Sequence, residues 1–99
     1  MVKAHIATGK DRRKGLSGVK SLPPDQALLL LNAPVIHMVG MRLPLDLVFI
    51  GWNQKIIKIC TNVKPGMRLA GSVSARHCLE MASGSAKAYG LHKGQQLTW

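Results

Sequence analysis

The positions of apolar residues along the chain predict short β-strands separated by turns. Apolar and polar residues alternate near the N-terminus and again before residue 82, which is typical of strands with one buried face. Other stretches are short and continuously apolar, and the prolines beside them favour buried strands over helices. The predicted strands cover residues 2–6, 27–31, 35–39, 45–50, 55–63, 75–81 and 96–99.

Two short helices are predicted between these strands. One covers Lys10–Lys14 and ends at Gly15, and the other begins at the candidate N-cap Ser83 and ends before Gly90. Short connections favour antiparallel pairing, and closure of a sheet hides its edges. The sequence therefore predicts one α+β domain over residues 1–99, mainly antiparallel β. Its compact barrel-like sheet would have about six or seven short strands, with the two helices beside it.

Composition supports a folded domain and adds a strong positive charge. The chain has 99 residues, with 14 Lys+Arg against 4 Asp+Glu, so its formal net charge is +10. Hydrophobic residues make up 46%, which is too many for a disordered polybasic tail. The two cysteines, Cys60 and Cys78, are too few for a disulfide framework, so we expect reduced, buried thiols.

Neither a signal peptide nor a membrane span is expected. The first residues lack a long apolar segment. The longest uncharged stretch, residues 26–41, is shorter than the roughly 20 residues needed to cross a bilayer, and Pro34 interrupts it. We therefore expect a soluble, cytoplasmic protein.

Three motifs resemble one known family. They are Arg12-Arg13-Lys14-Gly15-Leu16, the stretch from His37 through Pro44-Leu45-Asp46 to Ile50, and Leu79-Glu80-Met81-Ala82-Ser83-Gly84-Ser85-Ala86. In this order, over nearly the whole chain, they resemble the bacterial and archaeal "domain of unknown function 192". The sequence departs from the family at Gln95, where Asp is frequent, and at residues 52–54, where an Asp-rich hairpin is usual. The resemblance implies a mostly β, barrel-like fold with short helices, and it implies no activity.

Asp46 is the most unusual residue of the central motif. It lies between Leu45 and Leu47 in a strand otherwise suited to burial, and a buried carboxylate needs a cation or several hydrogen-bond donors. One interpretation is structural: an internal salt bridge with Arg42 or Arg12, or a turn-capping role. The functional interpretation is a small polar cleft that binds an anionic ligand. Its candidate residues are Arg12, His37, Arg42, Asp46 and Glu80.

The sequence gives no positive support for an enzyme. His37 has the chemistry of a base or a ligand, but no nucleophile or second ligand is recognisable beside it. No Gly-x-Ser-x-Gly elbow or P-loop is present. Cys60, Cys78 and His77 lack the spacing of a zinc site, so no metal and no cofactor are predicted. An enzyme centred on His37 and Asp46 is therefore the weakest hypothesis.

Basic residues form two clusters that suit a polyanion. Such clusters neutralise phosphates and release counterions, although a merely solvated basic surface has the same composition. The candidate residues are Lys10, Arg13, Lys14, Lys55, Lys58, Lys64 and Arg68. Only four aromatic residues are present, which offers little area for base stacking.

The leading functional prediction is thus a binding or accessory module for a small anionic ligand or a protein partner. Nucleic-acid or other polyanion binding through the basic surface is the alternative, and the oligomeric state is left open.

Overall fold

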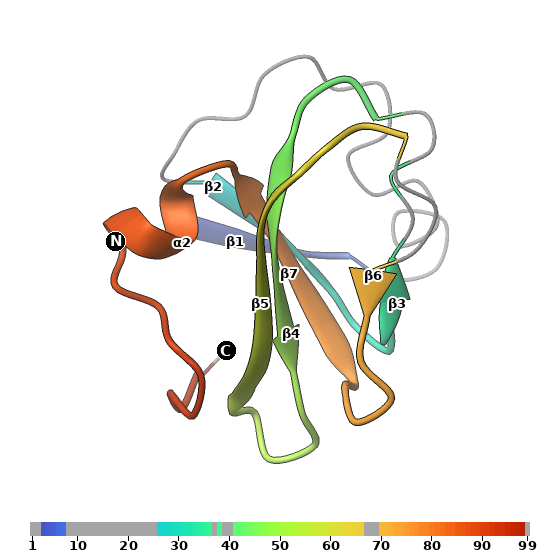
Figure 1. The fold of residues 1–99 in the computed structure, drawn as a ribbon. Coiled ribbons are helices and arrows are strands. Elements are labelled where there is room, and N and C mark those ends of the chain that lie inside the picture. Colours follow the sequence, from blue (N-terminus) through green and yellow to red (C-terminus); the bar gives the residue numbers. More distant parts are fainter. Residues whose placement is uncertain (1–2, 8–25, 37, 39–40, 67–69, 99) are drawn as a thin grey trace.

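The computed structural model describes residues 3–7, 26–36, 38, 41–66 and 70–98, and these residues form two β-sheets and one short helix (Figure 1). The strands are β1 (Lys3–Ala7), β2 (Gln26–Leu30), β3 (Val35–Ile36), β4 (Leu45–Ile50), β5 (Ile56–Val63), β6 (Ala70–Gly71) and β7 (His77–Ala82). The helix is α2 (Ser85–Ala88).

The larger sheet has five strands in the order β1-β2-β7-β4-β5, so β7 and β4 lie close to its middle. β2, β7, β4 and β5 pair antiparallel, whereas β1 pairs with β2 in parallel. The smaller sheet is the antiparallel pair of β3 and β6. The mainly antiparallel architecture predicted from the short connections is confirmed.

The central sheet buries side chains on both faces, which accounts for the continuous apolar runs in β2 and β4. One face packs against Ala86 of α2 and is called the helix face below. Its buried residues include Ala27, Leu29, Val48, Ile50, Ile56, Leu79 and Met81. The other packs against Ile36 of β3 and is called the β3–β6 face. Its buried residues include Leu28, Leu30, Leu45, Leu47, Phe49 and Cys78. Figure 1 shows α2 and the small sheet on opposite sides of the central strands.

The predicted barrel-like closure is wrong. β1 and β5 are the two edges of the larger sheet, and no strand within the described residues joins them. The beginning of β5 is covered locally instead. The Ile56 N–H donates to the Gln95 carbonyl at 2.9 Å, and the Gly94 N–H donates to the Ile56 carbonyl at 2.7 Å. Because the C-terminal segment pairs these edge groups, the strand start is protected without a closed barrel.

The number and length of the predicted elements also change. The count of six or seven strands in one sheet is not confirmed, because the sheet has five and the two-residue strands β3 and β6 form a separate pair. The predicted strand at 96–99 is reduced to a bridge between Lys55 and Gln96. The predicted helix at 10–14 lies outside the described residues, so two helices are not confirmed.

The predicted C-terminal helix is present but short. It begins at Ser85 and covers four residues. The preceding Gly84 has φ +91°, a left-handed conformation that side chains disfavour and glycine adopts readily. This turn brings the first N–H groups of α2 close to the start of β4, where the central motif lies.

Candidate functional site

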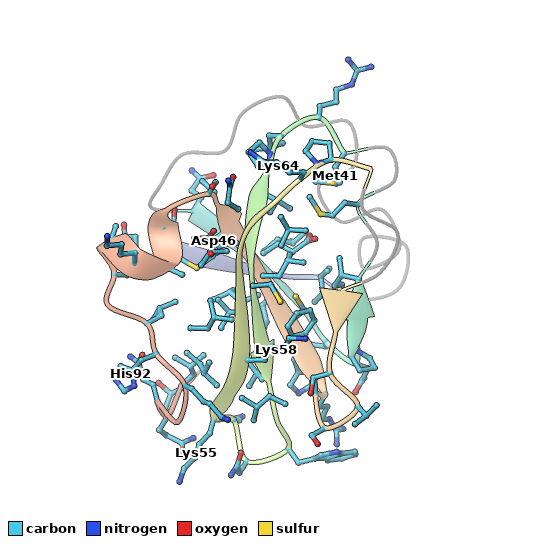
Figure 2. All side chains as sticks on the ribbon, viewed as in Figure 1. Met41, Asp46, Lys55, Lys58, Lys64 and His92 are labelled. Carbon is cyan, nitrogen blue, oxygen red and sulfur yellow. The ribbon has the colours of Figure 1, made fainter. Side chains whose placement is uncertain are left out.

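Asp46, on β4, is fully buried and accepts three hydrogen bonds from the backbone. Its Oδ1 accepts from the Asn62 N–H at 2.9 Å. Its Oδ2 accepts from the Gly84 and Ala86 N–H groups, each at 3.0 Å. The carboxylate therefore joins three segments: β4, the end of β5 and the turn that begins α2 (Figure 2).

The local backbone explains why these donors are available. Leu45 pairs with Val63 and Leu47 pairs with Cys60, so β5 carries one extra residue opposite Asp46. Such a bulge interrupts the hydrogen-bond ladder, and Asn62 adopts φ +51° there. The first N–H groups of a helix likewise have no partner within the helix. Asp46 accepts from the Asn62 N–H at the bulge and from the Gly84 and Ala86 N–H groups at the start of α2.

This geometry corresponds to the turn-capping interpretation of Asp46. The alternative structural interpretation was a salt bridge with Arg42 or Arg12. Arg42 is exposed whereas Asp46 is completely buried, and Arg12 lies outside the described residues. An anion that accepts several N–H bonds is stabilised without a paired cation. The Pro-Leu-Asp motif therefore has a clear architectural role in this chain.

Glu80, on β7, is the second buried carboxylate, with 3% of its surface exposed. Among the described residues no hydrogen-bond partner is present for its Oε1. Burial raises the pKa of Glu80 from 4.5 to about 7, because desolvation penalises the charged form. Near neutral pH the protonated and charged forms of Glu80 therefore have similar populations.

Asp46 and Glu80 lie on opposite faces of the sheet. Asp46 pairs with Met81, a residue of the helix face, whereas Glu80 pairs with Leu47, a residue of the β3–β6 face. Directly paired residues share a face, and successive residues alternate. The structure thus does not bring these two predicted ligand-binding residues together.

The rest of the predicted cleft is only partly described. Arg42 is exposed and precedes β4, while Arg12 and His37 lie outside the described residues. The enzyme hypothesis depends on His37 beside Asp46. Asp46 is the described half of that pair, and all of its observed partners are backbone N–H groups.

The thiols and histidines among the described residues form no recognisable metal centre. Cys60 and Cys78 are both free. Burial raises the pKa of Cys78 well above its ordinary value, and the nearby Glu80 and Cys60 add to the effect. No group of three or more His, Cys, Asp or Glu that could hold a metal occurs in the part of the chain that the structure describes.

His77, at the start of β7, instead has a structural contact. Its Nδ1 accepts the Asn32 N–H at 2.9 Å, in a turn where Asn32 has φ +57°. Burial lowers the pKa of His77, and the charge of Arg76 lowers it further. Both effects favour the neutral ring that can accept this hydrogen bond.

Three of the predicted polyanion-binding lysines follow the edge strand β5. Lys55 precedes it, Lys58 lies within it and Lys64 follows it, and all three are exposed (Figure 2). The Lys58 Nζ donates to the Gly71 carbonyl at 2.8 Å, which connects β5 to β6. The other predicted members, Lys10, Arg13, Lys14 and Arg68, lie outside the described residues.

Sequence reasoning missed a contact between Trp52 and Arg76. Trp52 is 76% exposed, and the Arg76 guanidinium lies 3.6 Å from the centre of its ring. The sequence contained one indication of this contact, a large aromatic residue, Trp52, inside the otherwise polar turn at residues 51–54. Nothing in the sequence singled out Arg76, because it lies at a polar position of the predicted strand at 75–81, where a charged residue is expected.

Comparison with known proteins agrees with the motifs. Residues 2–99 match the family described as Uncharacterized ACR, domain of unknown function 192. The chain belongs to this family. The predicted resemblance is thereby confirmed over nearly the whole sequence.

Two solved structures of similar chains have the same fold as this member of the family. A protein of unknown function from Novosphingobium aromaticivorans has a TM-score of 0.89 and 23% identity, and the match covers 99% of this chain and 75% of that one. A candidate transcription regulator from Sinorhizobium meliloti has a TM-score of 0.88 and 26% identity, with 98% and 81% covered. No curated protein matches the sequence. Within the described residues, no helix is long and apolar enough to cross a membrane.

Proposed function

We propose that the protein is a small binding module whose ligand is a polyanion, with nucleic acid as the class that fits best. One observation carries the proposal. The described surface has six exposed Lys and Arg side chains, whereas both described acidic residues, Asp46 and Glu80, are buried. The exposed cations are Arg42, Lys55, Lys58, Lys64, Lys87 and Lys93.

A surface of this kind favours phosphates for an electrostatic reason. Each lysine or arginine that neutralises a phosphate releases counterions from the polyanion, and the gain in entropy drives binding. Exposed carboxylates would oppose this effect by repelling phosphates. Here the folding of the chain withdraws the described carboxylates from solvent.

The spacing of the lysines favours an extended ligand over a small anion. Lys55 and Lys64 flank β5, so at about 3.3 Å per residue they lie up to roughly 30 Å apart along the strand. A small anion contacts only one such position at a time, whereas a chain of phosphates contacts several. The description of the Sinorhizobium meliloti neighbour as a candidate transcription regulator agrees with nucleic acid as the ligand.

The test is a salt-dependent binding titration with the full chain. Fluorescence anisotropy of a labelled DNA duplex is measured from about 50 to 200 mM NaCl, and we expect affinity to fall linearly with salt on logarithmic axes. The Lys55→Gln/Lys64→Gln variant should weaken binding and lower the salt slope by about 2. Lys58 is left intact, because its Nζ contacts Gly71.

The matched control is Arg42→Gln/Lys87→Gln, which removes the same charge from exposed positions outside β5 and outside the C-terminal segment that pairs with it. It should keep most of the affinity and slope. Absence of binding to duplex and single-stranded DNA at low salt would contradict the function. Equal weakening by the two double variants would contradict the assignment to β5.

A further inference from the structure

The turn that connects β4 to β5 presents a large aromatic side chain to solvent. Trp52 lies in this turn and is 76% exposed. The turn is held by the Gln54 N–H, which donates to the Gly51 carbonyl at 3.1 Å, and by the Gly51 N–H, which donates to the Lys55 carbonyl at 2.9 Å. The indole is therefore carried by a hydrogen-bonded hairpin at the end of two paired strands.

A second loop lies beside this hairpin. The Arg76 N–H donates to the Ile50 carbonyl at 2.7 Å, which connects the residues before β7 to the end of β4. Figure 1 shows both loops at the same end of the molecule. Val73, in the second loop, is fully exposed. The large hydrophobic side chains that are exposed in the described residues, Trp52 and Val73, thus come from these neighbouring loops.

Arg76 contacts the Trp52 indole in a way that favours the binding of a planar ligand. Its guanidinium lies 3.6 Å from the centre of the Trp52 ring and covers one side of it. The high exposed fraction of Trp52 leaves the rest of the ring in contact with solvent. Because the guanidinium restricts the rotation of the indole, less side-chain entropy remains to be lost when a ligand stacks on it.

The charge around Trp52 selects among planar ligands. Arg76 and the exposed Lys55 are cations at this end, and no described Asp or Glu is exposed. A nucleotide combines a base that stacks on an aromatic ring with a phosphate that contacts a cation. In a duplex the base faces are stacked on one another, so only an unpaired base offers a free face.

We propose that Trp52 is a stacking site for an unpaired base of single-stranded nucleic acid, with Arg76 and Lys55 contacting the neighbouring phosphates. The proposal rests on polyanion binding as the function, and it names the form of nucleic acid that this end of the molecule recognises.

The test compares two ligands with matched phosphate numbers. A labelled single-stranded DNA of about 12 nucleotides, within the usual site size of such proteins, is titrated beside a duplex with the same number of phosphates. Trp52→Ala should weaken single-strand binding at least about five-fold, the lower limit for the loss of one stacked base. Duplex binding should change less than two-fold. Trp52→Phe keeps an aromatic face and should restore much of the affinity.

Intrinsic fluorescence supplies a second measurement. In a Trp99→Phe background, Trp52 is the remaining tryptophan of the chain. Stacking on a base should quench its emission in parallel with single-strand binding. The melting temperature of Trp52→Ala should stay close to that of the parent, because the side chain is exposed.

The possible results separate the two proposals. Unchanged single-strand affinity in Trp52→Ala, or an equal loss with the duplex, would overturn base stacking while salt-dependent binding still supported the function. No binding to either DNA would remove both. Polyglutamate that binds as tightly as the single strand, and with the same dependence on Trp52, would indicate an acidic protein partner and overturn the assignment to nucleic acid.

Discussion

Replacement of Asp46 by asparagine should strongly destabilise the fold. The substitution keeps the size of the side chain but removes its charge and replaces one acceptor oxygen with a donor. If the asparagine keeps its Oδ1 toward the Gly84 and Ala86 N–H groups, its amide faces the Asn62 N–H, donor against donor. The partly buried Asn62 N–H then loses its partner, and the two remaining hydrogen bonds lose their charge assistance.

The cost follows from these three changes. A hydrogen bond to a charged group contributes about 1.5–3 kcal/mol, and a neutral one about 0.5–1.5 kcal/mol. One lost bond and two weakened bonds together reduce the free energy of unfolding by about 3–5 kcal/mol. For a domain of this size, each kcal/mol lowers the melting temperature by about 4–8 °C, so we expect a fall of at least about 12 °C.

Urea and thermal unfolding monitored by circular dichroism measure this effect. The matched control is Ser83→Ala at the same turn, which removes an exposed hydroxyl that donates to the Asn62 Oδ1 at 2.9 Å. Its unfolding free energy should change by less than about 0.5 kcal/mol, as for other surface substitutions. A urea midpoint for Asp46→Asn equal to that of the parent would refute the capping role, and Asp46 would again be a candidate for ligand chemistry.

Three further predictions concern the interior and the α2 turn. The folded protein holds the Glu80 proton more tightly than the unfolded chain, so this contribution to stability is complete below pH 4.5 and is lost as pH rises through about 7. In urea unfolding, the stability of Glu80→Gln relative to the parent should increase by about 2–3 kcal/mol from pH 5 to pH 8. His77 titrates in both proteins, so its effect cancels in this comparison. Parallel pH profiles of the two proteins would contradict the prediction. Cys78 is buried and its pKa is raised, so a thiol reagent should modify at most Cys60 in the native protein, and release of two equivalents without unfolding would count against this. Gly84→Ala should lower the free energy of unfolding in urea by about 1–2 kcal/mol, because alanine disfavours the left-handed φ at this position. No atom lies within 4 Å of the new Cβ, so steric contact adds nothing to this cost. An unchanged urea midpoint would mean that the turn relaxes.

Local pattern was sufficient for the central strands. The apolar run at 45–50 coincides with β4, and the run at 27–31 differs from β2 by one residue at each end. These strands are buried on both faces, so their sequences are continuously apolar and the flanking prolines limit their length. The pattern does not encode the partner of each strand. The placement of β7 between β2 and β4, and the parallel pairing of β1 with β2, depend on contacts between distant segments.

The candidate site was predictable only at the level of single residues. A carboxylate between two leucines indicated burial and a need for donors, and both follow from desolvation. Its donors lie 16, 38 and 40 residues further along the chain, so no local pattern identified them. Asp46 and Glu80 were likewise both predicted to line one polar cleft. Their separation onto two faces depends on the register of β4 against β7, in which Asp46 pairs with Met81 and Leu47 pairs with Glu80.

The two buried acids also change what the net charge of the chain means. The whole sequence has only 4 Asp+Glu, and folding removes two of them from solvent: Asp46 into a set of backbone donors and Glu80 into the apolar β3–β6 face. The described surface is therefore more basic than the composition indicates, because cations remain exposed while anions are taken into the interior. Polyanion binding responds to the charges that a ligand can contact. The burial of Asp46, which stabilises the α2 turn, thus also removes from the surface a group that would repel a phosphate chain.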